Sequence, residues 1–233
     1  MYEITRLIHL SDPGDPQALD AIVERVTSAA SATGARRTLV SPTLAGVRNG
    51  GDLVVHLQFD SEEEWRRGRT DFDEATSAGS VARVNSVEYH GANTRLPGDS
   101  GRRENTGREG IVYRILLLRV DETATDQLIN EFERALLRMP RYVTSIQAWQ
   151  LSHVTEAGGD SRWTHVWEQE FADTDGLLGE YMDHPIHWAS VDAYFDPENP
   201  RCIVRDRVCH SFCTADEPVV PTAELAGSVD SAR

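Results

Sequence analysis

The predicted strands and helices of this chain follow one order twice along its 233 residues. Each half shows a strand, a helix, two strands, a second helix and a last strand, as judged from apolar alternation, helical periodicity and turn residues. In the first half we predict strands at 3–10, 38–44, 52–59 and 84–90, with helices that begin at residues 16 and 61. In the second half we predict strands at 111–120, 143–154, 162–171 and 202–212, with helices at 125–138 and 174–194. This is the order of a ferredoxin-like unit, an antiparallel four-stranded sheet with both helices on one face.

The other face of such a sheet must also be buried. Residues 115–118 read Ile-Leu-Leu-Leu, so this strand is apolar on both faces, as expected for a strand between helices and a second sheet. We therefore predict an α+β fold of two tandem ferredoxin-like (βαββαβ) units, whose sheets cover each other as an intramolecular dimeric α/β barrel. The barrel is a pseudo-dimer within one chain, and a further homodimer is left open.

Composition divides the chain into four segments. The two units span 1–90 and 110–213. Residues 91–109 are polar and rich in glycine, without an apolar period, and we interpret them as a linker. Residues 214–233 are interpreted as a disordered tail.

The formal net charge of −15 limits the partners of the chain. It excludes nucleic acids and anionic membranes, because both require a positive field on the protein. No stretch approaches the roughly 20 apolar residues of a membrane helix, and Glu3 and Arg6 stand where a signal peptide would be apolar. The three cysteines make no disulfide framework. We expect a cytoplasmic protein that handles small molecules.

Two motifs in the second half carry a family resemblance. Residues 163–166 read Trp-Thr-His-Val, and residues 181–187 read Tyr-Met-Asp-His-Pro-Ile-His. The segment resembles the stress-responsive dimeric α/β-barrel (Dabb) family, which includes plant olivetolic acid cyclase and in which a Tyr-Thr-His strand precedes a Tyr-x-x-His-Pro-x-His helix. The resemblance covers about the last hundred residues before the tail. It implies the barrel fold and, from the cyclase, a catalytic role for Tyr181 and His187.

Pro185 is expected to bring these two residues together. It cannot continue the hydrogen bonding of the preceding turn, so the helix should break near His184. On an unbroken helix Tyr181 and His187 would point about 120° apart. In the implied reaction His187 removes a proton from an activated methylene and Tyr181 donates a hydrogen bond to the forming enolate. The alternative is that both only pack at a helix break and that His184 caps a helix.

Strand alternation supplies the expected pocket wall. Four residues face the helices: Trp163, His165, Trp167 and Phe171. Together with Tyr181, His184 and Trp188 they would line an apolar pocket holding a few polar groups, the usual composition of a small-molecule site.

Two departures from the family pattern modify the expected substrate. Many members have a histidine in the first strand where this chain has Arg114, and Asp206 matches a common aspartate. Arginine stays protonated and cannot act as a base. We therefore predict an Arg114–Asp206 ion pair in the pocket and a substrate that carries a carboxylate.

The histidines and cysteines of the second half have poor spacing for a metal site. His184 and His187, with His165 as a third ligand, could suit zinc or iron, but Pro185 lies between them and no carboxylate stands at ligand spacing. Cys209 and Cys213 are separated by four residues of strand, roughly 13 Å. No glycine-rich phosphate loop, nucleophile elbow or dinucleotide fingerprint is present. We expect neither a metal nor an organic cofactor.

These features favour a cofactor-independent acid/base enzyme of small-molecule metabolism. The substrate would be a carbonyl or polyketide-like compound, and the enzyme a cyclase, isomerase or lyase. The alternatives are a non-catalytic protein that binds a small ligand in a stress response and a cofactor-free oxygenase. An offset of 112 aligns the two units and places Arg69, Phe72 and Ala75 opposite the motif, so the first unit is expected to have no equivalent site.

Overall fold

The computed structural model describes residues 1–104 and 110–221. The first half comprises β1 (Tyr2–Leu10), α1 (Pro16–Ala32), β2 (Arg37–Pro42), β3 (Leu53–Phe59), α2 (Glu62–Ser77) and β4 (Val81–His90). The second half comprises β5 (Ser100–Arg102), β6 (Ile111–Val120), α3 (Asp126–Tyr142), β7 (Ala148–Gly158), β8 (His165–Phe171) and β9 (Val204–Ala215). Three short helical segments lie between β8 and β9: Gly176–Tyr181, His187–Val191 and Asp192–Tyr194.

Local sequence signals explain where the three long helices begin. The Asp15 side chain accepts hydrogen bonds from the backbone N–H groups of residues 17 and 18, and Pro16 occupies the first helical position. Ser61 caps α2 by accepting from Glu64 N, and the Glu64 carboxylate accepts from Asp60 N. Thr125 caps α3.

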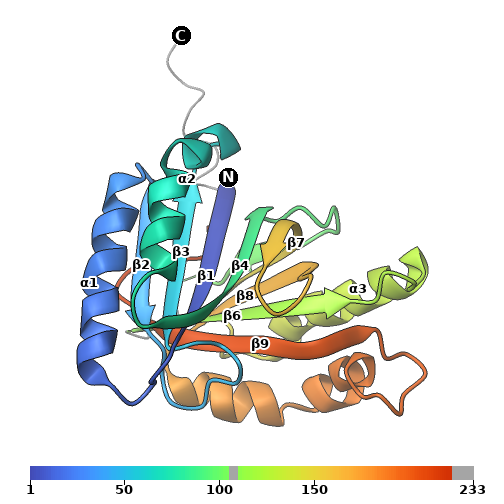
Figure 1. The fold of residues 1–233 in the computed structure, drawn as a ribbon. Helices are drawn as coiled ribbons and strands as arrows, with labels where there is room; N and C mark the ends of the chain where they lie inside the picture. The colour runs from blue at the N-terminus through green and yellow to red at the C-terminus, as the bar shows by residue number, and fades with distance from the viewer. Residues whose placement is uncertain (105–109, 222–233) are drawn as a thin grey trace.

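Both halves have the same strand order, which confirms the predicted repeat. The sheet runs β2-β3-β1-β4-β7-β8-β6-β9, so each unit places its second, third, first and fourth long strands in that order. Strands β4 and β7 pair antiparallel and join the two units. At the other end, bridges from Thr43 to Cys213 and from Arg48 to His210 bring the β2–β3 connection onto β9. The sheet thus curls toward a barrel, with α1 and α2 outside one half and α3 outside the other (Figure 1).

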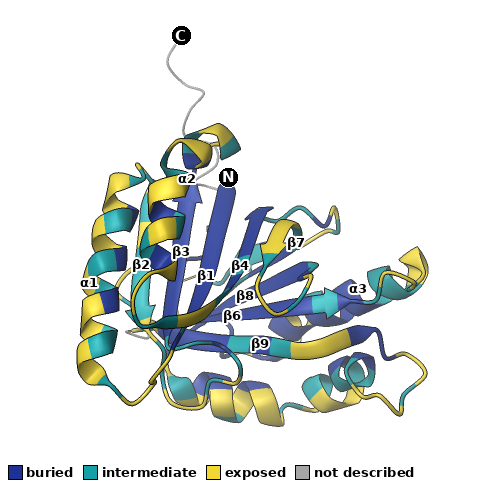
Figure 2. Cartoon of the chain, in the orientation of Figure 1, coloured by how far each residue is buried: buried dark blue, intermediate teal, exposed yellow. Residues whose placement is uncertain are grey.

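Three apolar clusters fill the layers of the molecule. We call β2-β3-β1-β4 the first sheet and β7-β8-β6-β9 the second sheet, although β4 and β7 join them. One cluster lies between α1, α2 and the first sheet, and another lies between the second sheet and its helices. The third lies between the strands of the two units and confirms that the two halves of the sheet cover each other, which is why β1, β3, β6 and β8 are buried along almost their whole length (Figure 2). Its members from the two halves include Leu7, Val54, Val87, Tyr89, Tyr113, Ile115, Leu117 and Val166.

The layer between the sheets also holds a buried polar network. Tyr113 donates to Glu168 Oε1 at 2.7 Å, and Gln150 Nε2 donates to Glu168 Oε2 at 2.9 Å and to Glu3 Oε2 at 2.6 Å. Burial raises the pKa of Glu168 to about 7 and also raises that of Glu3, which the Glu168 charge raises further. Burial lowers the pKa of His56 to about 3. Glu168 points away from the helices, as strand alternation requires for a neighbour of Trp167, and that face of β8 is the barrel interior.

The structure modifies two of the predicted segments. Within the expected linker, Ser100–Arg102 forms β5, which pairs with β7. Within the expected tail, β9 continues to Ala215, and Val219 and Val220 are buried. Their N–H groups each donate to Glu170 Oε1 at 2.7 Å, so buried apolar side chains and a buried acceptor hold this piece. Residues 105–109 of the linker and 222–233 of the tail lie outside the described residues.

None of the helices in the described part of the chain has the length and apolar character needed to cross a membrane.

Candidate functional site

The helical segment after β8 breaks at His184, next to Pro185, as predicted. A π-helical turn precedes the break, and another, His187–Val191, follows it. Within the break, Nδ1 of His184 accepts a hydrogen bond from Ile186 N at 3.2 Å. The rings of Tyr181 and His187 meet edge to face with centroids 5.1 Å apart. The break therefore brings the two residues together.

A pocket opens beside this pair, between the second sheet and its helices. Tyr181 and His187 line it with residues from β6, α3, β9 and the helical segment. The remaining lining residues are Arg48, Arg114, Leu116, Leu136, Met182, Val191, Asp192, Phe195, Val208 and His210.

Arg48 shows that the first unit also contributes to this pocket. It lies in the connection between β2 and β3, and its backbone exchanges hydrogen bonds of 3.0 and 2.9 Å with that of His210 on β9. The neighbouring Gly50 approaches so closely that a Cβ there would lie 2.5 Å from His210 O. The sequence indicated a turn at this place but gave no sign that it reaches the second unit.

Arg114 is the principal buried charge of the pocket. It is 3% exposed and donates to Gln169 Oε1 at 2.5 Å and to the Tyr181 hydroxyl at 3.3 Å. Its guanidinium carbon lies 5.0 Å from the centre of the Tyr181 ring. Nε of Arg114 is buried without a hydrogen-bond partner, and no carboxylate among the described residues forms an ion pair with the group. An anionic ligand would compensate this charge.

The predicted Arg114–Asp206 ion pair is wrong. Asp206 pairs with Arg119 at 2.9 Å, accepts from Ser161 at 2.6 Å and is exposed. The register of β6 and β9 shifts between Leu117 and Arg119, and Asp206 adopts a positive φ of 59° in this irregularity. The bulge moves its side chain away from the pocket.

His187 has the environment of a neutral base. Burial lowers its pKa, the carboxylate of Asp192 opposes this effect, and Arg114 lowers the pKa further. Its Nδ1 lies 3.2 Å from Asp192 Oδ1. A carboxylate at this position can hold the hydrogen on Nδ1 and leave Nε2 as the acceptor. Sequence reasoning missed Asp192.

His210 also lines the pocket and was missed. Burial, then the nearby Arg114, lowers its pKa to about 3, so it is neutral at physiological pH. Its Nε2 is buried without a hydrogen-bond partner.

Several residues predicted for the pocket lie elsewhere. Trp167 is fully buried in the core under the helices, and Trp188 is 59% exposed. Trp163 lies on the opposite face, in the layer between the sheets, because β8 begins only after it. His184 does not line the pocket, and His165 contacts Glu133 and His153 instead of Tyr181.

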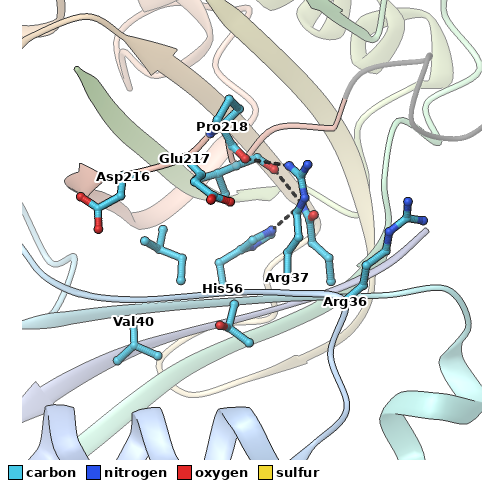
Figure 3. Close-up of a pocket in the computed structure, with 12 residues that line it drawn as sticks. Arg36, Arg37, Val40, His56, Asp216, Glu217 and Pro218 are labelled. Carbon is cyan, nitrogen blue, oxygen red and sulfur yellow. Dashed lines mark hydrogen bonds between the residues drawn. The ribbon is translucent and has the colours of Figure 1, made fainter. Parts of the chain in front are cut away.

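A second cavity lies between β2 and the segment that follows β9 (Figure 3). Arg37 Nη1 donates to Pro218 O at 2.8 Å, and Gln58 Nε2 donates to Val219 O at 2.7 Å. His56 at its floor lies 3.2 Å from the same Gln58 nitrogen. The segment at 215–219 thus forms one wall of a cavity in the first unit. This cavity is not equivalent to the pocket around Tyr181, and no sequence pattern indicated it.

A family model matches most of the second unit. Residues 112–209 match the family model described as "Stress responsive A/B Barrel Domain". No curated protein sequence matches the chain.

Solved structures resemble the whole chain at low sequence identity. An anthrone oxidase-like protein gives a TM-score of 0.64 at 10% identity, over 91% of this chain and 90% of its own. A putative monooxygenase from Lactobacillus acidophilus NCFM gives 0.52 at 10% identity, over 95% and 98%. A mutant chlorite dismutase from Candidatus Nitrospira defluvii gives 0.52 at 11% identity, over 91% and 90%. At these identities the likeness shows the shared fold alone.

Proposed function

Because residues 112–209 match the model of the stress responsive A/B barrel domain, we propose that the pocket around Tyr181 and His187 is the active site of a small-molecule enzyme. The reaction is acid/base chemistry on a carbonyl or polyketide-like compound, and needs no organic cofactor. The observation that carries the proposal is the contact between these two rings at a helix break, beside a buried arginine. The chemical class is a cyclisation, isomerisation or lyase reaction.

The proposed roles follow from the hydrogen bonds of each group. His187 takes a proton from a methylene next to the carbonyl through Nε2, because Asp192 faces its Nδ1. Arg114 donates to the Tyr181 oxygen, so the Tyr181 hydroxyl keeps its own hydrogen for the substrate. That hydroxyl donates to the carbonyl oxygen as it gains enolate charge, and the guanidinium stabilises this charge through it.

The cationic lining supports a substrate with an anionic group. Arg114 and Arg48 both line the pocket, and Asp192 is the carboxylate that lies against His187. A carboxylate on the substrate would satisfy the buried guanidinium, whose Nε is otherwise unpartnered.

The test is turnover of a panel of β-keto and aromatic compounds, each with and without a carboxylate. We expect Tyr181→Phe and His187→Ala to lower turnover by about 10² or more, the scale for loss of a positioned acid or base. Arg69→Ala is the matched control, since Arg69 is the position equivalent to Tyr181 in the first unit. A comparable loss of turnover in Arg69→Ala would show that the active site lies in the first unit and that the proposal assigns it to the wrong half.

A non-catalytic ligand-binding protein would behave differently in the same assay. Wild type would bind members of the panel without converting any of them, and the two substitutions would alter affinity alone. That result would reject the enzyme and support the binding protein.

A cofactor-free oxygenase is a second candidate, because two proteins with this fold are named anthrone oxidase-like protein and putative monooxygenase. An oxygen electrode decides between the two reactions. Oxygen uptake in proportion to substrate consumed would support the oxygenase, whereas equal turnover under nitrogen would support the cyclase, isomerase or lyase.

A further inference from the structure

Three potential metal ligands converge away from the pocket described above. Glu133 on α3, His153 on β7 and His165 on β8 place one ligand atom each within 4.8 Å of one another. Nε2 of His153 lies 2.5 Å from Glu133 Oε1, and Nε2 of His165 lies 3.2 Å from the same oxygen. The cluster is formed by residues that the proposed function does not use.

The sheet register explains why these side chains meet. His153 and His165 are directly opposite in the antiparallel pairing of β7 and β8, so their side chains lie on the same face of the sheet. That face packs against α3, where Phe132 contacts the His165 ring and the adjacent Glu133 reaches both imidazoles. Two rigid strands and a helix thus hold the three groups.

We propose that Glu133, His153 and His165 bind a divalent transition-metal ion, through one carboxylate oxygen and the two Nε2 atoms. Bonds of about 2.0–2.2 Å in a tetrahedral arrangement separate ligand atoms by about 3.4 Å. The separation of 3.2 Å between His165 Nε2 and Glu133 Oε1 is close to this value, whereas the 2.5 Å between His153 Nε2 and the same oxygen would have to lengthen by about 0.9 Å. The side chain of His153 is partly exposed and can make this movement. Two imidazoles and a carboxylate suit zinc, ferrous iron or another first-row ion.

The charge state of the cluster favours a cation. The side chain of Glu133 is 3% exposed and lies against both imidazoles. No lysine or arginine among the described residues forms an ion pair with Glu133. A divalent ion would compensate this buried carboxylate.

Surrounding groups can orient the ligands and admit a further one. Thr164 Oγ1 lies 2.8 Å from His165 Nδ1, where it can hold the ring hydrogen and leave Nε2 for the metal. His153 is 43% exposed in its side chain and lines a surface pocket with His90, Asn93, Thr94 and Arg95. Three protein ligands leave at least one coordination position open toward this pocket, as in catalytic rather than structural zinc sites.

This site is separate from the pocket of the proposed function. On β6, Leu118 pairs with His165, whereas Arg114 pairs with Gln169. Four residues of strand correspond to roughly 13 Å. The inference replaces the expectation of a chain without metal, and it stands or falls independently of catalysis by Tyr181 and His187.

Metal binding by purified, tag-free protein tests the proposal. After treatment with a chelator, the protein should bind one Zn²⁺ or Co²⁺ per chain in calorimetry, and the Co²⁺ form should show visible d–d absorption. Loss of an outer-shell partner alone typically costs 10- to 100-fold in affinity, so Glu133→Gln and His153→Gln should each weaken binding by about 100-fold or more. His184→Gln is the matched control and should bind as wild type does.

The proposal is overturned if wild type binds no stoichiometric ion, if both ligand variants bind as tightly as wild type, or if the control loses binding. Circular dichroism verifies folding. His153 is partly exposed, so His153→Gln decides the outcome should Glu133→Gln fail to fold.

Discussion

The buried Glu168 should make the stability of this protein depend on pH near neutrality. Its carboxyl group lies between the two sheets, and burial raises its pKa from 4.5 to about 7. Tyr113 and Gln150 donate to it, which limits the rise. Glu168→Gln keeps the shape of the side chain and removes the charge. The substitution therefore isolates the cost of ionising this group inside the barrel.

The sign follows from the direction of the shift. A group whose pKa is higher in the folded state binds more protons there, so its contribution is complete below pH 4.5 and is lost as the pH rises through about 7. The rise in the pKa of Glu168 from 4.5 to about 7 corresponds to about 3 kcal/mol in the free energy of unfolding. The pKa of the neighbouring Glu3 is also raised, so its ionisation adds to the loss of stability as the pH rises. The pKa of the neighbouring His56 is lowered, so its titration has the opposite effect. The difference between variant and wild type largely cancels their contributions.

Urea denaturation at a series of pH values measures this difference. Relative to wild type, Glu168→Gln should become more stable by about 2 to 3 kcal/mol between about pH 5 and about pH 8. Glu131→Gln is the control, because the pKa of this partly exposed carboxylate is lowered from 4.5 and its titration therefore lies below the window. Parallel stability curves for wild type and Glu168→Gln would refute the argument that Glu168 is ionised at a cost inside the barrel.

Three further predictions concern the pocket and its frame. Asp192→Asn should lower the pKa of His187 further, because the carboxylate now opposes the effect of burial; an NMR titration of the imidazole that moved upward would contradict this. Arg114→Gln should weaken binding of a carboxylate ligand by about 10- to 100-fold, measured by calorimetry, while equal affinity would show that the guanidinium does not contact it. Gly50→Ala should destabilise the protein by about 1–3 kcal/mol in urea, because its Cβ would meet the backbone of His210; unchanged stability would mean that this contact is loose.

Short-range sequence signals predicted the starts of the helices, the order of the strands and the position of the helix break. The caps at Asp15, Ser61 and Thr125 start their helices through side-chain acceptors that the sequence displays. Alternation and turn residues predicted the strand order of both units, and the run at 115–118 predicted burial on both faces. Pro185 predicted the helix break and, through it, the meeting of Tyr181 and His187.

The rest depends on register and on contacts between the units. An irregularity between β6 and β9, in which one residue of β6 stands opposite three residues of β9, turned Asp206 outward, and no residue type indicated it in advance. Glu133, His153 and His165 come from three elements and meet only because β7 and β8 pair at one particular register. Arg48 reaches the pocket of the other unit through a bridge to His210. None of these contacts leaves a spacing pattern in the sequence.

The different second helices explain why the two related units differ in the pocket they form. In the first unit α2 runs without interruption over Glu62–Ser77 and packs Trp65 and Phe72 against its sheet, which leaves this interface filled. Arg69, at the position equivalent to Tyr181, is tied on the surface to Asp73 and Glu156. In the second unit the break at Pro185 and the π-helical turns on both sides of it change the direction of the side chains, as π turns often do at functional sites. The pocket is therefore a consequence of the interrupted helix in the second unit, and Arg48 of the first unit completes its lining through the bridge to β9.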